Sequence, residues 1–330
     1  MSSLLFVSGQ IAALEDKLLK QGQLDRMIGA STPDEAFAVM AELSYAQYFD
    51  DSLRARDFAS VIERGLMETK SLLVNGTDDH SVLGLIWWKF DVNNIKRAIK
   101  ERFIDQSTEV SEFVEDNGYS PLGSLSKDQI QDLVFKEIPI KSFPESIQSF
   151  ALEVNEADFD IYSVELLLDK AYFAAVKKVA KERSVKQYHQ LMVDGFNVRA
   201  LARSVLVFEK PLESDIWADG GSLNFHRFAE VETIDQLKDI LAKTPFGLAL
   251  SSSIETASGE GLLLKVEQIV DQYTYEWLKE LSLGNDSILR VLYYFEQRLQ
   301  NARMLKTVML GKFYGLEVGA IQEKLKHIGH

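Results

Sequence analysis

The stretch FDVNNIKRAIKERF, residues 90–103, places an asparagine and a nearby basic residue in an apolar frame, and this arrangement occurs three times in the 330-residue chain. The second copy lies in VDGFNVRALARSV (193–205) and the third in EQRLQNARMLKTVM (296–309). The three asparagines are Asn94, Asn197 and Asn301, spaced 103 and 104 residues apart. A fixed spacing of this size indicates repeated structural units rather than an isolated functional motif.

Two further sets of residues recur in the same order and with a similar period. Glutamates precede each asparagine motif at a spacing of 102 residues, as Glu63, Glu165 and Glu267. Further upstream, STPDEAFAVMAEL (31–43), LSKDQIQDLV (125–134) and ETIDQLKDILAKTPF (232–246) each combine a capping side chain with an early aspartate, as at the start of a helix. Three sets in one order predict three related domains, with boundaries at 1–105, 106–210 and 211–330.

The fold class follows from the spacing of apolar residues. Long segments such as YFAAVKKVAKERSVKQYHQLM (172–192) carry them at intervals of three and four, and there are only six prolines. Alternating patterns typical of strands are scarce. The sequence therefore predicts an all-α protein.

Composition restricts the classes of function. The net charge is −14, which argues against a nucleic-acid binder, because such proteins need a basic face for phosphates. The absence of cysteine favours a reducing compartment. The apolar run VLGLIWW (82–88) is far shorter than the roughly 20 residues that cross a bilayer, and the N-terminal stretch lacks the basic start of a signal peptide. We expect a cytoplasmic protein without a transmembrane segment.

The asparagine motif has a defined geometry on a helix. Positions one, four and eight after the asparagine lie on one apolar face, with the asparagine at its edge. The basic residue two positions on, which is Lys96, Arg199 or Arg303, points roughly away from that face. In one interpretation the asparagine binds backbone at a tight corner and the basic residue is solvated. In the other, the three basic residues line a shared surface and bind an acidic partner or a helix end.

The sequence contains little that suggests catalysis. A phosphate-binding G-x-x-x-x-G-K-[ST] motif does not occur, nor does G-x-S-x-G or H-E-x-x-H. The five histidines are scattered along the chain. We predict no catalytic residue, no bound cofactor and no metal site.

Several of these segments together resemble a known family. They are STPDEAFAVMAELSYAQYF (31–49), WKFDVNNIKRAIKERF (88–103), VELLLDKAYF (164–173), DGFNVRALARS (194–204) and NARMLKTVMLGKFYGLEVGAIQEKL (301–325). Their order and spacing are similar to those of the V-type (A-type) ATPase/ATP synthase C-subunit family, to which the d-subunit of the eukaryotic V-ATPase also belongs. The chain departs from a strict repeat where Arg298 replaces the aspartate before Asn301.

The resemblance implies three similar helical domains in a pseudo-threefold funnel. It implies a non-catalytic coupling subunit that links the central shaft to the proteolipid rotor ring and transmits torque for ion transport. One copy per complex would lie on the cytoplasmic face of the membrane. In that arrangement Lys96, Arg199 and Arg303 would be candidate partner-binding residues on the inner side of the funnel.

Two other classes remain open from the residues alone. A helical-repeat adaptor or scaffold unrelated to rotary ATPases would bind peptide helices in grooves, but its repeats are more often shorter than about 50 residues. An enzyme with an unrecognised site is the third class. Co-purification from membranes with ATPase subunits distinguishes all three.

Overall fold

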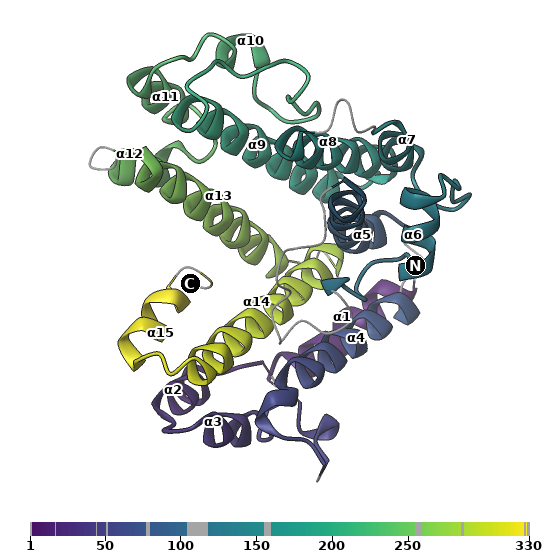
Figure 1. Cartoon of the computed structure of the whole chain (residues 1–330), viewed down its shortest axis with the longest axis vertical. Helices are drawn as coiled ribbons and strands as arrows, with labels where there is room; N and C mark the ends of the chain where they lie inside the picture. Colours follow the sequence, from purple (N-terminus) through teal and green to yellow (C-terminus); the bar gives the residue numbers. More distant parts are fainter. Residues whose placement is uncertain are drawn as a thin grey trace. The chain divides into compact units, whose positions relative to one another are not determined.

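The computed structural model describes residues 2–16, 18–43, 45–50, 52–76, 80–103, 118–154, 160–254, 259–284, 287–326 and 328. Every regular element in these ranges is a helix, which confirms the all-α prediction (Figure 1). The elements are α1 (Ser2–Glu15), α2 (Gln21–Gly29), α3 (Pro33–Met40), η1 (Ala46–Tyr48), η2 (Ala55–Asp57), α4 (Phe58–Gly76), α5 (His80–Phe103), α6 (Lys127–Phe135), α7 (Glu145–Glu153), α8 (Ile161–Val179), α9 (Arg183–Leu206), α10 (Phe225–Phe228), α11 (Ile234–Leu241), α12 (Gly247–Ile254), α13 (Gly259–Ser282), α14 (Ser287–Phe313) and α15 (Val318–Leu325).

The chain divides into two compact units. The terminal unit comprises Met1–Asp78, Glu109–Gly118 and Leu281–His330, and the middle unit comprises Asp79–Thr108 and Tyr119–Glu280. Both ends of the chain therefore belong to one unit. The predicted boundary between residues 105 and 106 lies outside the described residues, and the one between 210 and 211 falls in the connection that follows α9. The three predicted domains follow the sequence repeat, and their boundaries remain a prediction.

Each copy of the repeat begins with a short capped helix, as the sequence indicates. In α3, α6 and α11 the side chain of the N-cap residue accepts a hydrogen bond from the backbone N–H three residues later, which satisfies one of the free amides of the first turn. The three pairs are Thr32 with Glu35, Ser126 with Gln129, and Thr233 with Gln236. The first turns also contain Asp34, Asp128 and Asp235.

Two long helices follow in each copy, and each of them packs against a long helix of another copy. The Asn helices, which carry the asparagine motif, are α5, α9 and α14, and the Glu helices, which carry the recurring glutamate, are α4, α8 and α13. In the middle unit α5 packs against α8, the Glu helix of the next copy. In the terminal unit α14 packs against α4, so the third copy contacts the first. In these pairs the Asn helix packs on the Glu helix of the following copy, in cyclic order.

Helices α9 and α13 come close at one point in the middle unit. A Cβ atom added to Gly195 would lie 2.7 Å from the side chain of Val270, so the absence of a side chain permits this approach. The third Asn helix–Glu helix pair of the repeat is therefore also present.

The core of the terminal unit joins the two ends of the chain. Residues of α2, α3 and α4 form one buried cluster with residues of α14 and α15. Phe58 of α4 stacks on Phe313 of α14 with ring centroids 5.9 Å apart, and Ile321 of α15 is fully buried. The C-terminal helix is thus part of the same core as the N-terminal helices.

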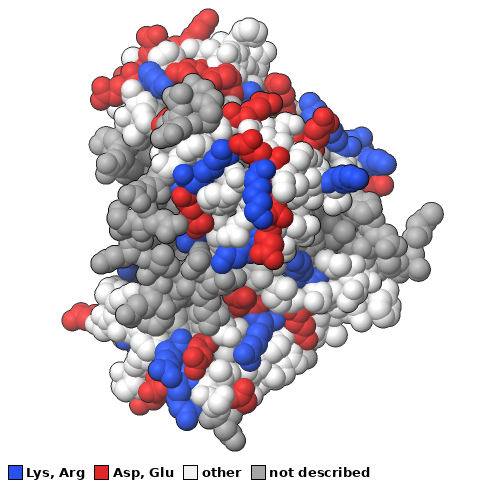
Figure 2. Space-filling view, turned by 45° about the vertical axis from the view of Figure 1, so that its right-hand side comes forward, with Lys and Arg blue, Asp and Glu red and all other residues white. Residues whose placement is uncertain are grey.

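The surface contains both signs of charge. On the described part of the face drawn in Figure 2, Lys and Arg side chains lie next to Asp and Glu side chains. The ion pairs between these side chains therefore show which helices are connected.

Candidate interaction site

The asparagines of the first two copies bind the backbone of a following connection. Asn94 accepts a hydrogen bond from the N–H of Ser120 at 2.8 Å and donates one to its carbonyl at 2.9 Å. Asn197 makes the same two contacts with Ala218, both at 2.9 Å. A side-chain amide of this kind replaces a neighbouring peptide group, so the connection is fixed on the helix without regular secondary structure.

The aspartates three positions earlier hold the same connections. The buried carboxylate of Asp91 accepts from the Ser124 hydroxyl at 2.6 Å and the Leu125 N–H at 2.9 Å. Asp194 accepts from the N–H and hydroxyl of Ser222, at 2.7 and 2.6 Å, and from the following N–H at 3.1 Å. Burial raises the pKa of Asp194, and these hydrogen bonds oppose that shift by favouring the charged form.

Glycines make room for these aspartates. A Cβ atom at Gly123 would lie 2.3 Å from a carboxylate oxygen of Asp91, and one at Gly221 would lie 2.1 Å from the oxygen of Asp194. The sequence Gly-Ser-Leu recurs at 123–125 and 221–223 and was not part of the predicted repeat. This tripeptide is the sequence feature from which the contact between the aspartate and the connection could have been predicted.

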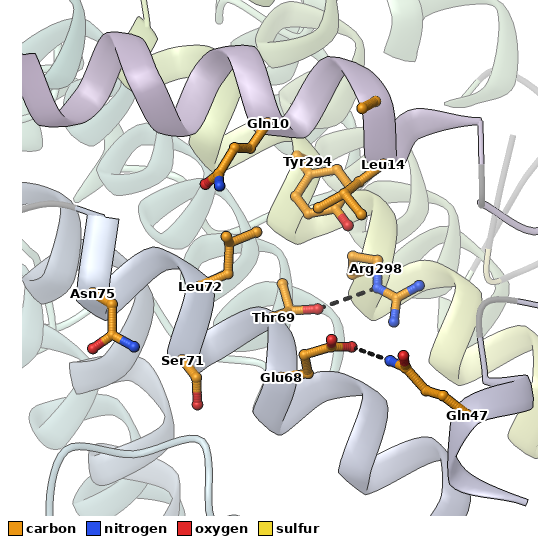
Figure 3. A pocket seen from close by; sticks show the side chains of 11 residues that line it. Gln10, Leu14, Gln47, Glu68, Thr69, Ser71, Leu72, Asn75, Tyr294 and Arg298 are labelled. Carbon is orange, nitrogen blue, oxygen red and sulfur yellow. Dashed lines mark hydrogen bonds between the residues drawn. The ribbon is translucent and has the colours of Figure 1, made fainter.

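The third copy differs at both positions. Asn301, with its amide oriented to pair both polar atoms, accepts from the N–H of Leu19 at 2.9 Å and donates to the carbonyl of Gln297 at 3.3 Å. It thereby holds the segment before α2, at the other end of the chain. Arg298 replaces the aspartate and is 4% exposed. It donates to the Thr69 hydroxyl at 3.3 Å (Figure 3). It also donates to the Gly65 carbonyl at 3.3 Å.

Ion pairs join the Asn helix to the Glu helix of the next copy in the middle unit. Lys96 of α5 binds Asp169 of α8 at 2.6 Å, and Lys100, one turn further, binds Glu165. The reversed order of the partners indicates antiparallel helices. Burial raises the pKa of Asp169, and the Lys96 ammonium opposes this rise.

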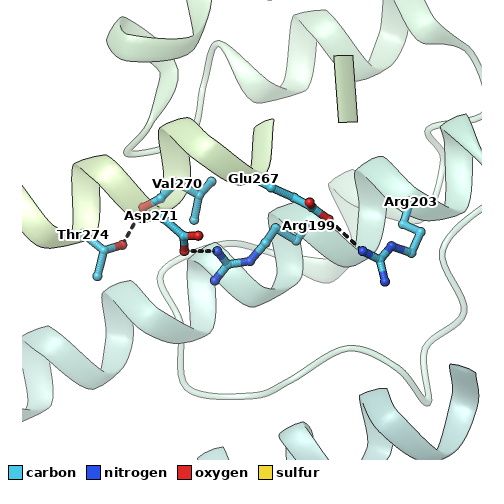
Figure 4. A network of polar contacts seen from close by, with 6 residues as sticks. All are labelled: Arg199, Arg203, Glu267, Val270, Asp271 and Thr274. Carbon is cyan, nitrogen blue, oxygen red and sulfur yellow. Dashed lines mark hydrogen bonds and ion pairs between the residues drawn. The ribbon is translucent and has the colours of Figure 1, made fainter. Parts of the chain in front are cut away.

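The same ladder of ion pairs joins α9 and α13. Arg199 binds Asp271 at 2.6 Å, and Arg203 binds Glu267 at 2.7 Å (Figure 4). The recurring glutamates Glu165 and Glu267 are thus partners of basic residues on the adjacent Asn helix. Because these pairs are partly exposed, each contributes at most about 1 kcal/mol to stability.

The ladder changes in the terminal unit. Arg303 of α14 is exposed and forms no ion pair with any residue that the structure describes. Four residues after Glu63, α4 carries Met67 where α8 and α13 carry the aspartates. Lys96, by contrast, pairs with Asp169 of α8, and its side chain is only 13% exposed.

Two kinds of feature are absent from the described residues. Within these ranges, no group of three or more His, Asp or Glu side chains could hold a metal ion. None of the described helices combines the length and apolar character needed to cross a membrane. The recurring residues instead connect helices to one another.

These contacts between long helices are those of an all-helical protein, and comparisons with known proteins show the family to which the chain belongs. Residues 7–324 match the model of the ATP synthase (C/AC39) subunit family. The chain belongs to this family. It is also similar to the C-subunit of the A-type ATP synthase of Methanocaldococcus jannaschii, with 20% identity across 97% of this chain and 85% of that protein.

Proposed function

We propose that this chain is the non-catalytic coupling subunit of a rotary V/A-type ATPase or ATP synthase. It links the central shaft to the proteolipid rotor ring, one copy per complex, on the cytoplasmic face of the membrane. The observation that carries this proposal is the family match over residues 7–324.

The contacts between copies support a mechanical role. A part that transmits torque must not deform, so its helices need many specific connections. The Asn helices are connected to other copies by buried side chain–backbone hydrogen bonds, as at Asn197, and by ion pairs, as at Arg203. Buried polar contacts of this kind fix one arrangement of the helices, because shifted arrangements leave the same groups unpaired.

Among the three predicted partner-binding residues, Arg303 is the best candidate for an external contact. Lys96 and Arg199 already bind acids of the adjacent helix, so replacing them would also disturb the middle unit. Arg303→Glu reverses an exposed charge, and Lys306→Glu reverses another exposed charge on α14 as a matched control. We expect Arg303→Glu to weaken association with shaft or ring subunits at low salt, where exposed charges act most strongly.

The test of the coupling role is reconstitution. The rotary complex is assembled with and without this chain, and ATP hydrolysis and ATP-driven ion transport are measured in vesicles. We expect hydrolysis by the catalytic head to persist without the chain while transport is lost, and transport to return when the chain is added. Full coupled transport in its absence would refute the proposal, as would a tight nucleotide site on the isolated chain in calorimetry.

A further inference from the structure

The terminal unit contains a cavity beside Arg298 that no recognised role accounts for. Its volume is about 520 Å³, and α1, α4 and α14 supply most of its walls. This volume lies within the range of small-ligand sites, roughly 300–1,000 Å³. The residues that line it are Gln10, Ala13, Leu14, Gln47, Glu68, Thr69, Ser71, Leu72, Asn75, Tyr294 and Arg298 (Figure 3).

The cavity occurs in the copy that departs from the repeat. In the other two copies, the position of Arg298 is an aspartate that accepts hydrogen bonds from a connection packed directly against it. In the third copy the arginine is directed to α4 instead, where it contacts Thr69 and Gly65. A buried residue has thus changed from an acceptor of backbone N–H groups to a guanidinium at the wall of a cavity.

Two donors face the same part of this cavity. The guanidinium of Arg298 and the ring of Tyr294, one turn earlier on α14, lie together on its wall (Figure 3). The hydroxyl of Tyr294 makes no hydrogen bond to any residue that the structure describes, although its side chain is 4% exposed overall. Burial raises the pKa of this hydroxyl, so it keeps its proton and can donate.

The acidic group at the cavity has partners of its own. Glu68 accepts hydrogen bonds from Gln47, at 2.7 Å, and from the hydroxyl of Tyr48. Glu68 is thus held by neutral donors, and among the lining residues Arg298 is the cationic one.

We propose that this cavity binds a carboxylate group carried on a short apolar stem. The carboxylate would accept hydrogen bonds from Arg298 and Tyr294, because a planar guanidinium matches the two oxygens of a carboxylate. The stem would contact Leu14 and Leu72. The carboxylate belongs to a small organic acid or to the free C-terminus of a polypeptide. This proposal does not depend on the coupling role.

The test is a titration followed by NMR of the full chain with labelled Leu, Ala and Thr methyl groups. The probes are butyrate and the peptide Ac-Ala-Ala-Leu in two forms, one with a free C-terminal carboxylate and one amidated. We expect the free acids to shift the methyl signals of Leu14, Leu72 and Thr69, and we expect the amidated peptide to leave them in place. Saturation by butyrate identifies a small-acid site, and saturation by the free peptide alone identifies a C-terminus site.

Variants establish that the response arises in the cavity. Tyr294→Phe removes one donor and keeps the ring, and Arg298→Met removes the charge. Each should weaken binding, the second by about tenfold or more, since hydrogen bonds to a charged group are the stronger ones. Lys306→Met, an exposed change on the same helix, should leave binding unchanged. Tyr294→Phe provides the test where Arg298→Met fails to fold.

Two results would overturn the proposal. One is the absence of shifts with both free acids at concentrations up to tens of millimolar. The other is an equal response in the folded variants and the unchanged protein, because binding would then not involve these donors.

Discussion

Replacement of Asn197 by alanine should cost more stability than any loss of an exposed ion pair in this protein. Asn197 is fully buried, and both its amide atoms pair with the backbone of Ala218 at 2.9 Å. The alanine variant leaves a buried N–H and a buried carbonyl without partners, and each costs about 1–3 kcal/mol. We therefore expect a loss of about 2–6 kcal/mol, a large part of the 5–15 kcal/mol typical of a folded protein.

The measurement is urea unfolding followed by tryptophan fluorescence and, separately, by circular dichroism. All four tryptophans, at positions 87, 88, 217 and 277, lie in the middle unit, so fluorescence reports on the unit that contains Asn197. Circular dichroism reports on the helices of both units. The fluorescence midpoint should fall in Asn197→Ala, with the slope indicating whether unfolding remains cooperative.

Asn301→Ala is the matched comparison. Asn301 receives one N–H from another segment, that of Leu19, and its second contact is with its own helix. The loss of stability in Asn301→Ala should therefore be smaller, about 1 kcal/mol. It should appear mainly in the circular dichroism signal. A cost below about 1 kcal/mol for Asn197→Ala, or equal costs for the two variants, would refute the role assigned to the paired amide.

Three further predictions concern packing, pH and a helix end. Gly221→Ala should destabilise the middle unit because the new Cβ would lie 2.1 Å from an oxygen of Asp194, whereas Gly261→Ala, with nothing within 4 Å, should stabilise its helix by about 0.5–1 kcal/mol in the same urea assay. Burial lowers the pKa of His189 below 6.5, so the unfolded state takes up a proton at a higher pH than the folded state does. Stability should therefore fall as the pH drops below 6.5, and His189→Gln should reduce this dependence of stability on pH. Lys312→Met should lower the melting temperature, since the ammonium binds two carbonyls at the end of α2 and partly offsets its dipole.

The local features of the fold could be predicted from the sequence because they depend on neighbouring residues. A capping side chain such as Thr233 acts on an amide three positions away, so the starts of α3, α6 and α11 are visible in the sequence. The helical period also appears within a few turns. These signals identified the fold class and the order of helices in each copy.

The partnerships between long helices could not be predicted in the same way. A period near 103 residues is the same whether α4 packs against α5 or against α14. The ion-pair partner of Lys96 could not be predicted for this reason, since a helix considered alone does not show which of its sides faces a neighbour. Arg298 was visible as a departure from the repeat, but its relation to a cavity depends on α1 and α4, which lie more than 200 residues away in sequence.

The contact between α4 and α14 differs from that between α5 and α8 in the interactions that hold it. The α5–α8 contact has two ion pairs, and Asp91 of α5 holds the next connection. The α4–α14 contact has Arg298 in place of that aspartate and a cavity along part of its length. A ligand that binds only the folded state stabilises that state in proportion to the logarithm of its concentration. A carboxylate in the cavity would therefore strengthen the terminal unit at its most distinctive contact, between helices from opposite ends of the chain.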